Sequence, residues 1–112
     1  MIKVRYLYEL KGQIGREEEE YNIGERGKVE DLWRNILERH PIEIESAGYV
    51  NPETKLPYVF DPEALSPKSL NILFHRQGLP GFRNIIWYDG IKTEVCDGDT
   101  VIISPPKCGC CV

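Results

Sequence analysis

Cysteine is the residue type that concentrates chemistry in this sequence. Three of the four cysteines, Cys108, Cys110 and Cys111, stand within the last five residues, and Cys96 precedes them. A thiolate is a nucleophile and a metal ligand, and it can hold an extra sulfur as a persulfide. All four lie in the last 17 residues, so they cannot cross-link the chain as a whole, and no disulfide framework is expected.

The tail from Lys107 to Val112 is too short to form an element of its own. Exposed thiols in such a tail are free to react, so they could carry sulfur as persulfides or disulfides. The alternative without chemistry is an interaction module that ends in an unreactive tail.

A metal site is a further alternative. It would use Cys96, Cys108 and either Cys110 or Cys111, since thiolates are preferred ligands of Zn²⁺ and softer metals. Adjacent cysteines do not easily bind one metal ion together, so a fourth ligand such as His75 would be needed. The string also lacks the usual C-x₂-C spacing of zinc sites.

Other polar residues do not form a catalytic constellation in the sequence. The two histidines, His40 and His75, are 35 positions apart, and no glycine-rich phosphate loop or nucleophile elbow is present. Asp97 and Asp99 flank Gly98 and are interpreted as turn formers. The chain is not expected to be an enzyme by itself.

The acidic run Glu17–Glu20 is interpreted as a solvated edge strand. Successive strand residues point to opposite faces, so its four carboxylates do not converge on one site. His40 is interpreted as a boundary residue near the carboxyl end of a helix.

The first forty residues predict two strands and a helix. Alternating apolar residues from Ile2 to Leu10 indicate a strand. A turn at Lys11–Gly15 then joins it to a second strand, Arg16–Ile23, as a hairpin. Apolar residues at helical spacing predict a helix over Lys28–His40, which Pro41 ends.

The remaining residues predict an insertion and three strands. Four prolines at about five-residue intervals indicate a partly ordered insertion over about 42–68. Further on, Thr100–Ser104 is apolar on both faces, which predicts a central strand. The other elements expected are a strand over Ser69–Arg76, a turn at Gly78–Gly81, a strand over Ile85–Tyr88 and a connection over Ile91–Val95.

Composition narrows the class of protein. The chain has 112 residues and a net charge of −4, which argues against nucleic acid as a partner. No apolar run approaches the roughly 20 residues that cross a membrane, and the amino terminus lacks a signal-peptide core. We expect a cytoplasmic protein with one domain, residues 1–106, and a flexible tail, residues 107–112.

The strand-pair, helix and closing-strand pattern resembles the ubiquitin-like β-grasp sulfur carriers of the MoaD/ThiS type. These are the small subunit of molybdopterin synthase and the thiamin sulfur carrier. The resemblance covers about residues 2–40 and 70–106. Four stretches carry it: Ile2-Lys-Val-Arg-Tyr, Val29-Glu-Asp-Leu-Trp, Asn71-Ile-Leu-Phe and, above all, Asp97-Gly-Asp-Thr-Val-Ile-Ile-Ser-Pro-Pro106.

The resemblance implies a fold and a mechanism. The fold would be α+β, with one main helix on a mixed sheet of about five strands. The chain end would be adenylated by an E1-like enzyme that uses ATP, converted to a thiocarboxylate, and passed to an acceptor large subunit or synthase for molybdopterin, tungstopterin or thiamin. No cofactor would be bound by the chain itself.

The tail departs from the family pattern, which ends in two glycines. Gly109 matches the first glycine and would let the tail thread a narrow channel, but Cys110 stands at the second, and Cys111-Val112 runs past the usual end. A carrier of this type would need trimming after Gly109 or Cys110, or a partner that accepts cysteine. The expected sulfur-carrying segment is Cys108, Gly109, Cys110, Cys111 and Val112.

Overall fold

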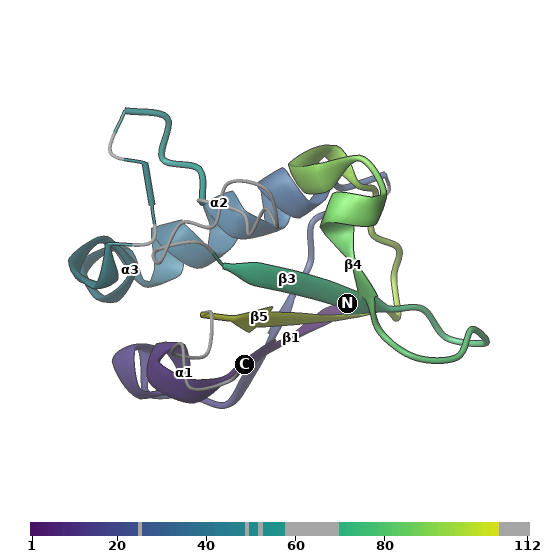
Figure 1. Cartoon of the computed structure of the whole chain (residues 1–112), viewed down its shortest axis with the longest axis horizontal. Helices are drawn as coiled ribbons and strands as arrows, with labels where there is room; N and C mark the ends of the chain where they lie inside the picture. The colour runs from purple at the N-terminus through teal and green to yellow at the C-terminus, as the bar shows by residue number, and fades with distance from the viewer. Residues whose placement is uncertain (25, 49, 52, 58–69, 106–112) are drawn as a thin grey trace.

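The computed structural model describes residues 1–24, 26–48, 50–51, 53–57 and 70–105. They form five strands and three α-helices, with two short 3₁₀ helices between the last strands (Figure 1). Within these residues, no helix is long and apolar enough to cross a membrane. In chain order the elements are β1 (Ile2–Tyr6), α1 (Tyr8–Ile14), β2 (Glu18–Tyr21), α2 (Val29–Arg39), α3 (Pro41–Ala47), β3 (Asn71–His75), β4 (Arg83–Asn84), η1 (Ile85–Trp87), η2 (Gly90–Lys92) and β5 (Thr100–Ser104).

The strands form one mixed sheet in the order β2-β1-β5-β3-β4. The last strand, β5, lies at its centre, parallel to β1 and antiparallel to β3. Val101, Ile102 and Ile103 are all buried, as expected for a strand covered on both faces. The predicted five-stranded mixed sheet and its central closing strand are confirmed.

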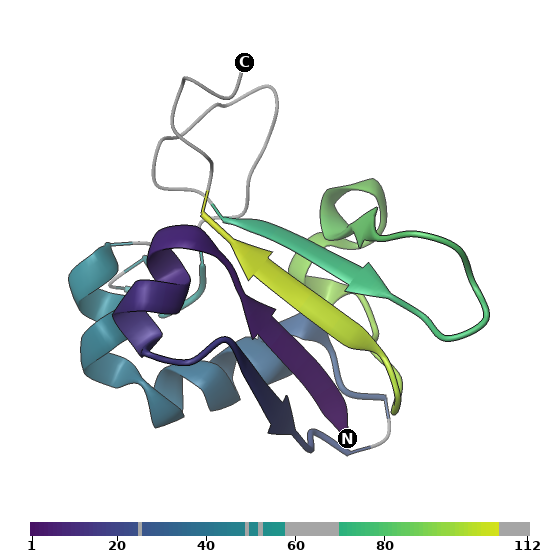
Figure 2. The ribbon, with the colours of Figure 1, turned by 90° about the horizontal axis from the view of Figure 1, so that it is seen from below.

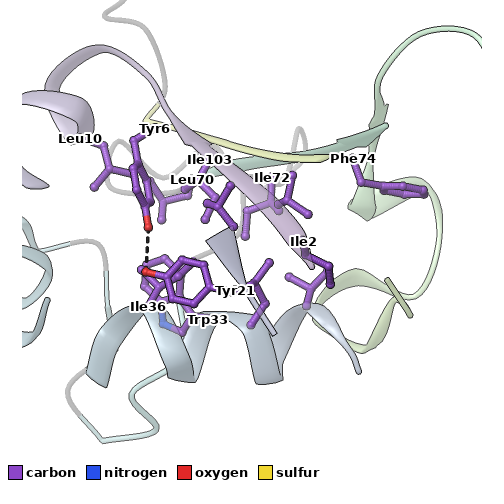
Figure 3. Close-up of a cluster of buried hydrophobic side chains, with 14 of the residues drawn as sticks. Ile2, Tyr6, Leu10, Tyr21, Trp33, Ile36, Leu70, Ile72, Phe74 and Ile103 are labelled. Carbon is purple, nitrogen blue, oxygen red and sulfur yellow. Dashed lines mark hydrogen bonds between the residues drawn. The ribbon is translucent and has the colours of Figure 1, made fainter. Parts of the chain in front are cut away.

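The core lies between one face of the sheet and α2 (Figure 3). Helix α2 turns a continuous apolar stripe toward the sheet, which confirms the helix predicted for this segment. Leu10 of α1 and Ile44 of α3 close the ends of the same core. The α2 side chains that are fully enclosed there are Val29, Leu32, Trp33 and Ile36.

The predicted strand over Ile2–Leu10 is wrong beyond Tyr6. The chain turns into α1, which ends at Gly15 with a left-handed φ of 80°, so the segment predicted as a hairpin turn is helical. Leu10 and Ile14 are both buried, one helical turn apart. The predicted antiparallel pairing of the first two strands is confirmed, because β1 pairs with β2.

Helix α3 overlaps the segment predicted to be a partly ordered insertion, about 42–68, and is a short addition to the one main helix, α2. Pro41 was predicted to stop a helix, and it does end α2, but it also begins α3, where its missing N–H costs nothing. Beyond α3, Val50 and Pro57 form an isolated bridge, and the Trp33 Nε1–H donates to the carbonyl of Lys55 at 3.1 Å. Residues 58–69 lie outside the described part.

The strand predicted over Ile85–Tyr88 is also wrong. It forms the 3₁₀ helix η1, and the strand before it, β4, has only two residues. The Asn84 side chain accepts a hydrogen bond from the Ile86 N–H at 3.1 Å, which starts the helical turn. Apolar residues alone did not distinguish this short helical turn, of which only Ile85 is buried, from a strand.

The Asp97-Gly98-Asp99 turn sets the start of β5. Gly98 has a left-handed φ of 93°, which glycine adopts without strain. Asp99 is buried and accepts hydrogen bonds from the Cys96 N–H at 2.8 Å and from Arg76 Nη2 at 3.2 Å. The two aspartates are thus structural, as predicted for turn formers.

Replacement of Ile36 by Ala tests the packing of α2 on the sheet. The Ile36 side chain is fully buried, so its truncation leaves a cavity and should lower the free energy of unfolding by about 2–5 kcal/mol. The matched control is Ile42→Ala, because Ile42 of α3 is 77% exposed and should change it by less than about 0.5 kcal/mol. Urea denaturation followed by circular dichroism measures both, and equal effects would contradict this assignment of the core.

Candidate functional site

The candidate site begins where β5 ends. The strand is held on both sides at this point: the Leu7 N–H donates to the Ile103 carbonyl at 3.2 Å, and Asn71 of β3 is the register partner of Ser104. The Ser104 hydroxyl donates to the carbonyl of the buried Pro105 at 2.9 Å. The tail therefore starts from a fixed base on the central strand, beside α1 (Figure 2).

The predicted sulfur-carrying residues lie beyond this base. Cys108, Gly109, Cys110, Cys111 and Val112 are outside the described residues, so the site they form remains a prediction. The structure instead defines the surface from which they extend.

The fourth cysteine lies at the other end of β5. Cys96 is exposed and precedes the turn that leads into the strand. The five residues of β5 then carry the chain about 17 Å away from it, at roughly 3.3 Å per residue. Among the described residues no group of three His, Cys, Asp or Glu side chains is arranged to hold a metal ion; the predicted partners Cys108 and Cys110 are not among them.

The outer face of the sheet, opposite α2, changes character from one edge to the other. Register pairs place Glu18, Arg5, Ile102, Leu73 and Asn84 in one row across it. At the β2 side of this row, the Arg5 guanidinium faces the Glu18 carboxylate at 3.8 Å. At the β5–β3 side, the buried Ile102 lies beside the half-buried Leu73, so this part of the row is apolar but little of it is exposed.

A polar cluster is buried on the inner side of β2, centred on Glu19. Its Oε1 accepts hydrogen bonds from the Tyr6 hydroxyl at 2.7 Å and the Tyr21 hydroxyl at 2.9 Å, and lies 2.8 Å from His40 Nε2. Its Oε2 lies 3.5 Å from Arg39 Nη1. Three elements of the fold, β1, β2 and α2, and the residue that follows α2, His40, thus meet at one carboxylate.

Two interpretations of the sequence need correction here. The acidic run is on an edge strand, as predicted, and Glu18 and Glu20 are exposed, but Glu19 points inward and is buried. His40 does end α2, yet it too is buried and has a partner. The signal available in the sequence was the inward register of Glu19, which it shares with the buried Tyr21 two residues later.

The ionisation of this cluster follows from its contacts. Burial alone would raise the pKa of Glu19, but hydrogen bonds from Tyr6, His40 and Tyr21 outweigh burial and lower that pKa below its ordinary value. Burial is also the main cause that raises the pKa of Tyr21 to about 12, and it raises the pKa of Tyr6 further. Glu19 is therefore a charged structural centre that ties the end of α2 to the sheet.

The hollow beside this cluster has mixed charge. A surface pocket of about 560 Å³ is lined by Arg16, Arg39, His40 and the three glutamates of β2. Both arginines already face Glu19 Oε2, Arg16 at 3.8 Å and Arg39 at 3.5 Å. We therefore assign the cluster and its pocket a role in the stability of the fold, and not in chemistry on a substrate.

Solved structures match this fold over nearly its whole length. A putative molybdopterin converting factor subunit 1 from Pyrococcus furiosus superposes with a TM-score of 0.63 at 25% identity, covering 95% of this chain and 97% of that one. Small archaeal modifier protein 1 from Methanosarcina acetivorans gives 0.65 at 24% identity, over 96% and 94%. A chain of the BexX/CysO complex from Amycolatopsis orientalis gives 0.64 at 20% identity, over 97% and 99%.

No protein-family model and no curated protein matches the sequence. The structural matches nevertheless confirm the β-grasp fold. They also agree with the resemblance to ubiquitin-like sulfur carriers that the sequence motifs indicated.

Replacement of Glu19 by Gln tests the buried cluster. The carboxamide cannot accept all of the present hydrogen bonds, so the free energy of unfolding at pH 7 should fall by about 1–3 kcal/mol. Because the pKa of Glu19 is lowered on folding, its contribution is present above the pKa of the unfolded carboxyl and is lost as pH falls toward the folded pKa. The free energy of unfolding, measured by urea denaturation, should therefore differ less between wild type and variant below about pH 4.5. The exposed Glu20→Gln is the control, and a difference that stays constant with pH would contradict the prediction.

Alkaline titration tests the two buried tyrosines. Because folding raises the pKa of Tyr21 to about 12 and that of Tyr6 further, the unfolded chain loses these protons first. Stability should hold below the ordinary tyrosine pKa of about 10 and decline as pH rises above it. Ultraviolet absorbance of tyrosinate follows the titration, with Tyr21→Phe as the assignment variant. A Tyr21 that titrates like an exposed tyrosine would refute the buried arrangement.

Proposed function

Because this chain is a ubiquitin-like β-grasp protein that matches a molybdopterin converting factor subunit over its whole length, we propose that it is a sulfur carrier. An E1-like enzyme would activate its carboxyl terminus, and an acceptor subunit or synthase would take the sulfur. The observation that carries the proposal is the tail of small and thiol residues that follows the central strand β5.

Two steps would load the tail. The terminal carboxylate would attack the α-phosphate of ATP in the partner's active site and release pyrophosphate, which leaves an acyl adenylate. A donor of sulfide would then displace AMP and leave a thiocarboxylate. The chain contributes the carboxylate and its positioning; ATP belongs to the partner enzyme.

The fold suits that positioning. The base of the tail is fixed between β1 and β3, so the reach of the tail is set by the residues after Pro105 alone. Gly109 lacks a Cβ and would pass a narrow channel. Apolar surface on the sheet would dock the partner enzyme, and the half-buried Leu73 of β3 is the candidate for it on the outer face.

Cysteines in the tail leave a second route to the same function. Cys110 occupies the position of the second family glycine, so either the chain is trimmed after Gly109 or Cys110, or the thiols themselves hold sulfur as persulfides. A pathway that makes a molybdenum or tungsten cofactor or thiamin is the destination we propose, with the protein in the cytoplasm.

The intact mass of the protein from its native cell tests the proposal. A chain that ends at Gly109 or Cys110 and carries sulfur in place of a carboxylate oxygen supports the thiocarboxylate route. Extra sulfur that a reductant removes supports the persulfide route. An unmodified chain that ends at Val112, also after incubation with ATP, a sulfide donor and the adenylating enzyme of the same genome, would overturn sulfur carriage.

The triple substitution of Cys108, Cys110 and Cys111 by Ser separates the two routes. Persulfide carriage should be abolished because all three thiols of the tail are gone. Thiocarboxylate formation after trimming at Gly109 should continue. Cys96→Ser is the matched control, because Cys96 lies at the opposite end of β5 and should leave either route unchanged.

A further inference from the structure

The edge of the sheet at β3 and β4 exposes a group of apolar side chains. Leu79, Phe82, Trp87 and Tyr88, here called the aromatic edge, are 41%, 48%, 73% and 46% exposed. They lie within ten consecutive residues, in the β3–β4 loop and around η1. Tryptophan and tyrosine are enriched at the centres of protein interfaces because they supply large contact area at low entropic cost.

Two side chains of the aromatic edge, Phe82 and Tyr88, are held in place by neighbouring side chains. The Tyr88 ring meets Phe74 edge-on with centroids 5.3 Å apart, and its hydroxyl accepts a hydrogen bond from Arg83 Nη1 at 2.9 Å. The Phe82 ring lies 5.3 Å from His75. A surface ordered in advance loses less conformational freedom on binding than a loose loop does.

Few acidic side chains lie near the aromatic edge. The stretch from Leu70 to Tyr88 contains Arg76 and Arg83 but no Asp or Glu, and the exposed Asp89 follows Tyr88 directly. Arg76 is neutralised by the buried Asp99 at 3.2 Å. Among the described residues Arg83 has the neutral Tyr88 hydroxyl as its hydrogen-bond partner and no ion pair. A partner that covers Arg83 must therefore supply a carboxylate, since a buried, unpaired charge is costly.

The same charge argues against a two-fold dimer through this surface. A two-fold contact places the same patch on both subunits, so two copies of Arg83 would enter one contact to which Leu79, Phe82, Trp87 and Tyr88 bring no carboxylate. Like charges that meet in a desolvated contact are unfavourable.

The loop part of the aromatic edge, with Leu79 and Phe82, also lies away from the tail. Loop residues 76–82 project from the end of β3, where His75 pairs with Thr100 at the start of β5, and the tail leaves from the other end of that strand (Figure 2). An enzyme that encloses the tail would leave this loop accessible.

We propose that the aromatic edge is a second docking surface, which binds a protein segment that presents apolar side chains next to a carboxylate. The apolar side chains would pack on Phe82 and Trp87, and the carboxylate would pair with Arg83. This surface does not depend on sulfur carriage.

A random-peptide phage library selected on the immobilised full-length protein tests the proposal. Peptides that bind should be enriched in Asp or Glu beside apolar residues, and selection on Arg83→Glu should shift that preference to Lys or Arg. Backbone amide resonances of residues 79–88 should move when a selected synthetic peptide is added. Trp87→Ala should lower the affinity for that peptide about tenfold or more. Ile42 of α3 is similarly exposed, and Ile42→Ala should leave the affinity unchanged.

Four outcomes would overturn the proposal. Selected peptides without an acidic preference would contradict the pairing of a carboxylate with Arg83. Peptides that perturb residues other than 79–88 would contradict the position of the docking surface. Self-association that Trp87→Ala abolishes would assign the surface to a second copy, and single-stranded RNA that competes with the peptide at Arg83 would assign it to nucleic acid. Near-ultraviolet circular dichroism of each variant shows that the fold is intact, and a conservative Trp87→Phe should retain part of the affinity.

Discussion

The structure depends on the burial of β5 between β1 and β3. This strand has neighbours on both edges and apolar side chains that are buried on both faces, so it is the least mobile place from which a tail can start. The turn before it is fixed by Asp99, which draws Arg76 and the Cys96 amide to one point. The described part of the chain thus gives the tail a base that is held on both sides.

The two edges of the sheet differ in charge, so they suit partner surfaces of different charge. The β2 side carries the acidic run, whose inward member, Glu19, ties α2 to the sheet and whose outward members face Lys3 and Arg5. The β3–β4 side has no acidic side chain up to Tyr88. A small protein with a net charge of −4 can therefore offer an acidic edge and a cationic, aromatic edge at the same time.

The sequence predicted the parts of the fold with long, consistent patterns and missed those where two patterns overlap. Helix α2 and strand β5 were foreseen because every local signal agreed. For Tyr8–Ile14 the sequence predicted strand and turn, because apolar residues alternate from Ile2 to Leu10 and this alternation hides the helical spacing of Leu10 and Ile14. Glu19 was missed because a run of like charges conceals its inward register. The tail chemistry rests on the cysteines and the resemblance alone, because the tail lies outside the described residues.

The place of β5 in the sheet also orders events during synthesis. Pairing of β1 with β5 joins residues such as Lys3 and Thr100, at opposite ends of the chain, and such distant contacts form slowly. A product that ends before Thr100 leaves β1 and β3 without the strand between them, so the pairs β1–β2 and β3–β4 cannot join into one sheet. Only a chain long enough to contain β5, and with it the base of the tail, can complete the fold and so resist cellular proteases.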